Sequence, residues 1–198
     1  MPNEKNQNKF ESYSLDFDGS SEKITTGATL SSLGISTQFS VSFWFKSTDL
    51  ADYDTIINAP YTATNWSSGF GFSIVSSKLR FWVDAWNTSP KFTNSDTLLI
   101  NTWYHAVGTF DTTNGLKLYI NSGTPSTASS TSIDGLTNPI GIGSSLTSYY
   151  FDGSISQVCI FDYALSSTQV SSLYNSGSPI NPMTLKPAPI AYYPLGGS

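Results

Sequence analysis

The sequence predicts an all-β protein, folded as a sandwich of two antiparallel sheets with one short helix near the C-terminal end. Short runs of alternating apolar and polar residues recur at intervals of about 8–12 residues, the spacing expected of strands in such a sandwich. Turn-forming pairs such as Asp18-Gly19 and Asn114-Gly115 follow some of these runs. One late stretch, residues 166–174, has helical spacing instead. The number of strands fits a jelly roll.

Residues 103–121 are predicted to form the hairpin at the centre of the domain. Side chains alternate along a strand, and both faces here carry apolar groups, for example Val107 on one side and Phe110 on the other. A strand that is apolar on both faces is usually central and covered twice. Asn114-Gly115 lies between the two runs and tolerates the positive φ of a tight reversal. We therefore expect the rest of the chain to pack around this hairpin.

The remaining strands are predicted from the same alternation. Before the hairpin, strands are expected at residues 13–18, 23–25, 39–45, 54–58, 70–75 and 78–83. Pro60 is expected to close the fourth of them, so that residues 59–69 form a loop, and residues 84–96 form a second loop. After the hairpin we expect a polar segment at 122–138 and strands at 140–142 and 153–161.

The predicted helix occupies residues 166–174. Its apolar positions have the spacing of one helix face, at Leu165, Val170, Leu173 and Tyr174. Ser166 is a favourable N-cap, and Gly177 and Pro179 are typical of the region just beyond a helix.

Three parts of the chain are distinguished. Residues 1–11 are polar and predicted to be a flexible arm, and residues 12–176 form the domain. Residues 177–198 begin with a Pro-, Ser- and Asn-rich linker. Within them, residues 189–198 either begin a further module of the same kind or fold back as an edge strand.

The composition indicates a large core under a weakly charged surface. Charged residues make up 12% of the 198 residues, against roughly 25% in an average globular protein, and aromatic residues make up 14%. The polar surface is therefore built from Ser, Thr and Asn, which is common in extracellular or particle-surface β proteins. A net charge of −5 and only nine Lys and Arg argue against nucleic-acid binding.

We expect neither a secretory signal nor a membrane-spanning segment. Residues 1–9 lack an apolar stretch, and no apolar run approaches the roughly 18–20 residues that span a bilayer. An extracellular type of surface without an export signal would suit a particle that is assembled in a cytoplasm and released later, such as a virion. A chain trimmed of its export signal would suit it equally well.

Taken together, several segments resemble the laminin-G-like, concanavalin A-like jelly-roll family. The matching segments follow the order of the family and cover residues 13–19, 39–45, 103–111, 116–121, 151–158 and 161–165 with the helix after it. The resemblance implies a concanavalin A-like jelly roll over roughly residues 13–176. The Ser- and Thr-rich style also resembles the versions of this domain that marine bacteriophages carry in structural proteins. One departure is that Ser156 and Gln157 stand where the family often has an acidic pair.

Aromatic side chains in predicted loops are the candidate ligand-binding residues. Aromatic faces stack on sugar C–H groups while amides supply hydrogen bonds, which is the usual chemistry of a carbohydrate site. The candidates are Tyr61, Asn65, Trp66, Trp86, Asn87, Tyr149 and Tyr150. Trp66 is preferred because no alternating pattern assigns it to the core. The alternative is that these side chains pack against neighbouring loops or subunits.

A structural calcium is considered at Asp18 and Asp152. Each follows a phenylalanine and precedes a glycine, at turns that the fold could bring to one edge. Calcium takes six to eight oxygen ligands, usually from several carboxylates and loop carbonyls. The alternative is that each aspartate accepts hydrogen bonds within its own turn. In related glucanases an acid at the position of Ser156 or Gln157 can help hold calcium, so its absence here weakens the case.

The pattern of acidic residues argues against an enzyme. Glycoside hydrolysis needs two carboxyl groups on either side of the scissile bond, about 5–10 Å apart. The three glutamates, Glu4, Glu11 and Glu22, all precede the core. His105 is interpreted as a structural, hydrogen-bonded histidine, and Cys159 as a small buried hydrophobic residue.

The sequence thus favours a non-catalytic domain that binds or displays. The first hypothesis is a structural module on the surface of a virion or similar particle, a decoration or fibre component that contacts neighbouring subunits or glycans and could form a homo-oligomer. The second is a lectin-like carbohydrate-binding module. A glycoside hydrolase is the third.

Overall fold

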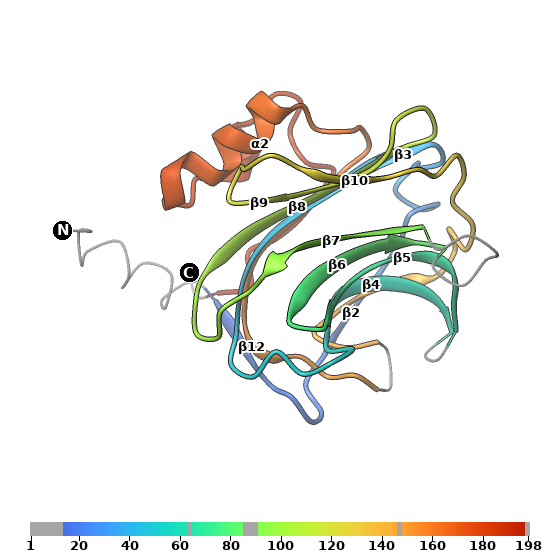
Figure 1. Cartoon of the computed structure of the whole chain (residues 1–198). Coiled ribbons are helices and arrows are strands. Elements are labelled where there is room, and N and C mark those ends of the chain that lie inside the picture. Colours follow the sequence, from blue (N-terminus) through green and yellow to red (C-terminus); the bar gives the residue numbers. More distant parts are fainter. Residues whose placement is uncertain (1–13, 63–64, 85–90, 146–147, 197–198) are drawn as a thin grey trace.

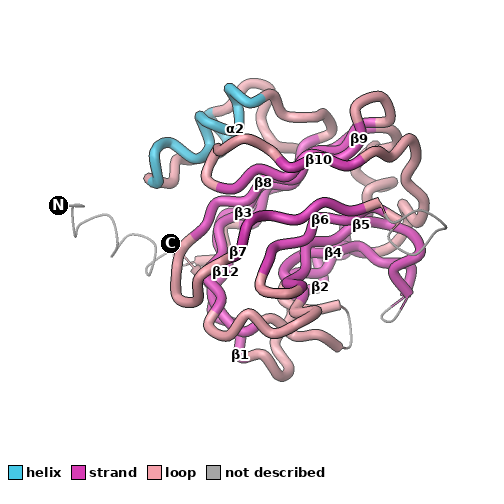
Figure 2. Tube along the Cα trace, in the orientation of Figure 1, coloured by secondary structure: helices cyan, strands magenta, loops and turns pink. Residues whose placement is uncertain are grey.

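Two antiparallel sheets packed face to face make up the computed structural model of the chain (Figure 1, Figure 2), which confirms the predicted concanavalin A-like sandwich. The structure describes residues 14–62, 65–84, 91–145 and 148–196, with residues 60–62 and 65–67 described by their backbone alone. Within these residues, no helix is long and apolar enough to cross a membrane.

Seven of the described strands form one sheet. The order is β1 (Leu15–Asp18), β12 (Asp152–Phe161), β3 (Gln38–Ser47), β8 (Tyr104–Asp111), β9 (Gly115–Ile120) and β10 (Ser126–Ala128), and β13 (Ala191–Tyr193) also pairs with β12. The predicted central hairpin, β8 and β9, therefore lies inside this sheet.

Six of the described strands form the second sheet. The order is β2 (Ile24–Thr29), β11 (Pro139–Ile142), β4 (Thr55–Thr62), β5 (Asn65–Val75), β6 (Lys78–Val83) and β7 (Phe92–Thr97). Because consecutive strands β4 to β7 are neighbours, this half of the sheet is a meander that ends at the edge strand β7.

Phenylalanine rings join the two sheets. Phe72 of β5 and Phe81 of β6 are stacked with ring centroids 4.6 Å apart, and Phe43 of the opposite sheet meets Phe72 at 4.9 Å. Directly facing these rings is Gly108 of β8, where a Cβ atom would collide with the ring of Phe72. The missing side chain at residue 108 therefore allows the two sheets to approach closely at the centre of the sandwich.

The helix α2 (Ser167–Tyr174) covers the outer face of the seven-stranded sheet (Figure 1). Its N-cap Ser166 forms the predicted cap, accepting a hydrogen bond from the backbone of Gln169, whose side chain in turn accepts one from the backbone of Ser166. Val170 and Leu173 pack with strand residues in a second apolar cluster. The central strands of this sheet are therefore covered on both faces, as their sequence predicted. Two 3₁₀ turns, Asn175–Gly177 and Pro182–Thr184, follow the helix.

His105 and Cys159 are both structural residues under this helix. The Nε2 atom of His105 lies 2.9 Å from the Ser42 hydroxyl, and its ring lies 4.9 Å from that of Trp44. Complete burial lowers the pKa of His105 to about 3, because the charged imidazolium would lose its hydration. The Cys159 thiol is buried, and desolvation raises its pKa. Both interpretations from the sequence are confirmed.

Two predicted loops are partly strands, so those predictions are wrong. Strand β4 continues through Pro60 to Thr62 and β5 begins at Asn65, where residues 59–69 were expected to be a loop. A proline is tolerated here because the pairing of β4 with β5 shifts register between Pro60 and Thr62. Strand β7 occupies residues 92–96 of the expected loop 84–96 and ends one residue beyond it, at Thr97.

β10 likewise lies within the polar segment 122–138, for which no strand was expected. At the other end of the chain, residues 191–193 pair with β12 beside β1 and so fold back as an edge strand. This is the second of the two arrangements that the sequence left open. The turns at Asp18 and Asp152 come together at one edge, as the sequence suggested they could, because these two residues are paired where β1 meets β12.

The burial of His105 predicts a specific dependence of stability on pH. A folded-state pKa of about 3, below the ordinary value of 6.5, means that only the unfolded chain takes up this proton between those pH values. Acidification through that window therefore destabilises the fold. Relative to a His105→Gln variant, the free energy of unfolding of the wild type should fall by about 2 kcal/mol between pH 7 and pH 5 in urea titrations. If the difference in free energy of unfolding between the wild type and His105→Gln did not change with pH, that result would contradict a buried neutral imidazole.

Candidate functional site

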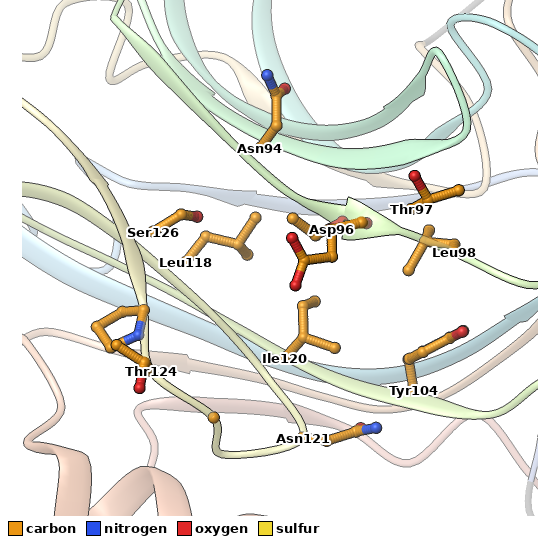
Figure 3. A pocket seen from close by; sticks show the side chains of 13 residues that line it. Asn94, Asp96, Thr97, Leu98, Tyr104, Leu118, Ile120, Asn121, Thr124 and Ser126 are labelled. Carbon is orange, nitrogen blue, oxygen red and sulfur yellow. The ribbon is translucent and has the colours of Figure 1, made fainter.

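A groove of about 470 Å³ lies where the free edges of the two sheets face each other (Figure 3). One wall is β7 and the residues that follow it, and the other wall is β9 with the segment that leads into β10. The two walls belong to different sheets, because β7 is an edge strand of the six-stranded sheet and β10 is an edge strand of the seven-stranded sheet. The groove is thus a product of the tertiary fold.

The floor of the groove is apolar. Leu118 and Ile120 of β9 and Leu98 after β7 present aliphatic side chains to it, and the Tyr104 ring lies at one end (Figure 3). The inward-facing phenylalanines that join the sheets lie on other strands. Smaller aliphatic groups at this edge leave space that the twist of the two sheets opens further.

A β-bulge directs one charged side chain into this space. Arg80 pairs with Asn94 and Lys78 pairs with Thr97, so β7 spans three steps where β6 spans two. The extra residue reverses the alternation of β7, as bulges do beside functional sites. As a result the carboxylate of Asp96 projects between the walls toward Ile120 (Figure 3). The hydroxyl of Ser95 accepts a hydrogen bond from Leu79 N at 2.9 Å and holds the two strands together at the bulge.

Most other polar side chains of the groove are already engaged. The Asn94 amide points away from Asp96, and its oxygen accepts a hydrogen bond from Arg80 Nε at 2.9 Å (Figure 3). The Asn121 amide oxygen accepts from His105 N, and the Tyr104 hydroxyl accepts from Leu99 N. The Ser126 hydroxyl is buried and has no partner among the described residues. The exposed polar side chains that line the groove are therefore those of Asp96, Thr97 and Thr124, whereas the Ser126 oxygen is covered.

The aromatic residues that were predicted to bind a ligand lie in different parts of the structure. Tyr149 lies against Tyr53 with ring centroids 5.6 Å apart, and both rings are 43% exposed. Both tyrosines have left-handed backbone angles, φ 55° and 76°, which non-glycine residues adopt at a cost of roughly 1–3 kcal/mol. Neighbouring Tyr150 forms a bridge to Thr55 and is less exposed.

The other predicted ligand-binding residues cannot be assembled into a site with these tyrosines. Tyr61 is in β4, and Asn65 and Trp66 are in β5, rather than in the expected loop, and their side chains are not described. Trp86 and Asn87 lie outside the described residues. Neither Tyr149 nor Tyr150 lines the groove. The role of these residues in binding stays a prediction.

Asp18 and Asp152 are neighbours, but the environment of Asp18 is that of a turn. Its carboxylate accepts hydrogen bonds from the backbone of Ser20 at 2.9 Å and of Ser21 at 3.0 Å, and from the Ser20 hydroxyl at 2.7 Å. These bonds, led by that of Ser20, hold its pKa well below the usual range. Among the described residues, no three His, Cys, Asp or Glu side chains are grouped so as to hold a metal ion. The Asp18 carboxylate is thus engaged within its own turn, which is the alternative to a calcium ligand that the sequence left open.

Asp54 is a perturbed acid that the sequence did not identify. It is only 8% exposed, and burial raises its pKa to about 7, with a further contribution from the nearby carboxylate of Asp49. One of its carboxylate oxygens is buried without a hydrogen-bond partner. A raised pKa is a common mark of a functional acid. Here the carboxyl group is covered, however, and offers a polysaccharide little surface to contact.

The fold and the groove define a β-sandwich of the lectin type. Residues 18–171 match the family model Laminin_G_3, described as the concanavalin A-like lectin/glucanases superfamily. The chain belongs to this family, as its sequence resemblance implied. No curated protein matches the chain.

Solved structures with low sequence identity share the fold. A protein from Bacteroides ovatus named as carbohydrate-binding has a TM-score of 0.66 and 17% identity, over 94% of this chain and 52% of that one. The heptameric SAP-like pentraxin of Limulus polyphemus has a TM-score of 0.58 and 14% identity, over 83% and 82%. Domain 4 of the arabinanase AbnA from Geobacillus stearothermophilus, solved with arabinotriose, has a TM-score of 0.53 and 23% identity, over 71% and 68%.

Proposed function

We propose that this chain is a non-catalytic carbohydrate-binding module whose ligand lies in the groove between β7 and β9–β10. The observation that carries the proposal is the combination of an apolar floor with the exposed polar side chains of Asp96, Thr97 and Thr124 in one groove. Its volume of about 470 Å³ falls within the range of ligand sites, about 300–1,000 Å³. Two of the similar structures, the Bacteroides ovatus protein and the AbnA domain, are carbohydrate-binding by name or by bound ligand and support the same class.

The chemistry of the groove suits a sugar. Leu118 and Ile120 offer aliphatic surface for the C–H face of a pyranose or furanose ring, whose burial is favourable by roughly 25 cal/mol per Å². The Asp96 carboxylate can accept hydrogen bonds from sugar hydroxyl groups, and the exposed hydroxyls of Thr97 and Thr124 can each donate or accept one.

The groove does not support glycoside hydrolysis. Asp96 is the one carboxyl group among the described residues that line it, whereas general acid and base, or acid and nucleophile, require two. The buried Asp54 is not among the lining residues. Binding without cleavage is therefore the proposed activity.

Filling the groove should abolish glycan binding without unfolding the domain. Thr124 is exposed on the β10 side of the groove, so a Thr124→Trp substitution places an indole in the cavity. Thr127→Trp is the matched control, since Thr127 is exposed on β10 but does not line the groove. On a glycan array, the wild type and the control should bind the same sugars, and Thr124→Trp should lose at least about tenfold in affinity.

The same array tests the aromatic candidates. Tyr149→Ala and Trp66→Ala should bind as the wild type does if the groove is the site. Loss of binding in either variant, with Thr124→Trp unaffected, would move the site away from the groove to the residue concerned. If the wild type bound no sugar at all, the carbohydrate-binding proposal would be overturned.

A second candidate function is a structural module on the surface of a virion or similar particle. Leu99 and Ile100, between β7 and β8, are 66% and 51% exposed and adjacent, which suits contact with a neighbouring subunit. The low charge of the chain is consistent with such packing. In this proposal the location would be the particle surface and the partners would be neighbouring subunits.

Light scattering with an in-line mass measurement separates the two candidates. A particle module should self-associate or bind its neighbour, and a Leu99→Ser, Ile100→Ser double variant should shift the mass to that of a monomer. A wild type that stays monomeric at about 100 µM, with the same mass as the double variant, would count against assembly through this loop.

A further inference from the structure

The groove has a negative charge and no compensating positive one. Asp96 is the one ionised side chain among its described lining residues. Its carboxylate has no hydrogen-bond or ion-pair partner among the described residues, although it points into a partly enclosed space (Figure 3). Asp96 is exposed at the groove, so its pairing with a cation would have the strength of a surface ion pair, roughly 0.2–1 kcal/mol.

Cationic side chains of the same region are directed elsewhere. The guanidinium of Arg80 lies 3.9 Å from the Phe92 ring centroid, while Lys91 pairs with Asp84 at 3.6 Å. Lys46 lies over the ring of Trp103, 5.5 Å from its centroid. None of these side chains lines the groove. The described lining of the groove therefore contains no positive charge to pair with Asp96.

The bulge in β7 is what makes this placement specific. Without the extra residue, Asp96 would share the face of Asn94, whose amide points away from the groove. With it, the carboxylate stands over Leu118 and Ile120 (Figure 3). A ligand that places a ring face on these two side chains and a cationic substituent at its edge would match both features.

We propose that the groove recognises amino sugars with a free ammonium group, which pairs with the Asp96 carboxylate while the sugar ring lies on Leu118 and Ile120. The inference rests on the proposed carbohydrate-binding function and adds its specificity. N-acetylated sugars lack the charge and bind less tightly. Uronic and sulfated sugars are repelled by Asp96, because no lysine or arginine among the described lining residues offsets it.

Calorimetric titration with three oligosaccharides of equal length tests the proposal. The probes are oligomers of glucosamine, of N-acetylglucosamine and of a uronic acid, at low salt and below the pKa of the sugar amine. For the wild type, affinity should fall in that order. The affinity for the glucosamine oligomer should exceed that for the N-acetylglucosamine oligomer by at least about fivefold, the ratio that corresponds to a free-energy difference of about 1 kcal/mol. This ratio should become smaller at high salt.

Two charge-neutralising variants locate the effect. Asp96→Asn should abolish the preference, so that the amine and the acetylated oligomer bind alike. Asp162→Asn is the control, because Asp162 is exposed outside the groove and its loss changes the net charge by the same amount. Both variants are expected to melt as the wild type does, since the described contacts of Asp96 involve only its backbone.

The outcomes separate this inference from the function on which it rests. Equal binding of charged and uncharged sugars by the wild type would overturn the specificity and leave carbohydrate binding intact. Binding to no oligosaccharide would overturn both. An Nα-acetyl-lysine amide, which keeps a free ε-ammonium group, that bound as tightly as the glucosamine oligomer, with the same loss in Asp96→Asn, would show a general ammonium site and contradict recognition of a sugar.

Discussion

The close approach of the two sheets at Gly108 is the constraint on which the rest of the structure depends. Phe72 and Phe81 can stack at 4.6 Å and still face the opposite sheet because β8 has no side chain at that point. This contact fixes the separation of the sheets at their centre. The twist of the two sheets then separates them at the edge formed by β7 and β10. Most side chains there are aliphatic or small and polar, so a groove remains between the sheets.

The two faces of the central sheet consequently have different roles. Its inner face forms the main core with the six-stranded sheet, and its outer face, with Val107 and Cys159, is sealed by α2. Contact with other molecules is left to the edges and the loops, and at the edge the β7 bulge directs Asp96 into the groove.

Much of the fold could be predicted from the sequence, because strand alternation and the Ser166 cap are local signals. The prediction failed at β7, whose residues Asn94, Ser95 and Asp96 read as a polar loop, because an edge strand with a bulge shows no regular apolar period. It failed at Pro60 because a register shift accommodates the proline. The groove was missed for a related reason. Some of its residues, such as Leu118 and Ile120, are ordinary strand residues and others lie in connecting segments, and only the approach of the edges of two different sheets brings them to one groove.

The central claim is that the groove between the two sheet edges holds the ligand. Its most direct test is a crystal structure of the chain soaked with an oligosaccharide that binds in solution. The account predicts density for a sugar ring on Leu118 and Ile120 with a substituent against the Asp96 carboxylate. Density in the loops near Tyr53 and Tyr149, with the groove filled only by water, would contradict it.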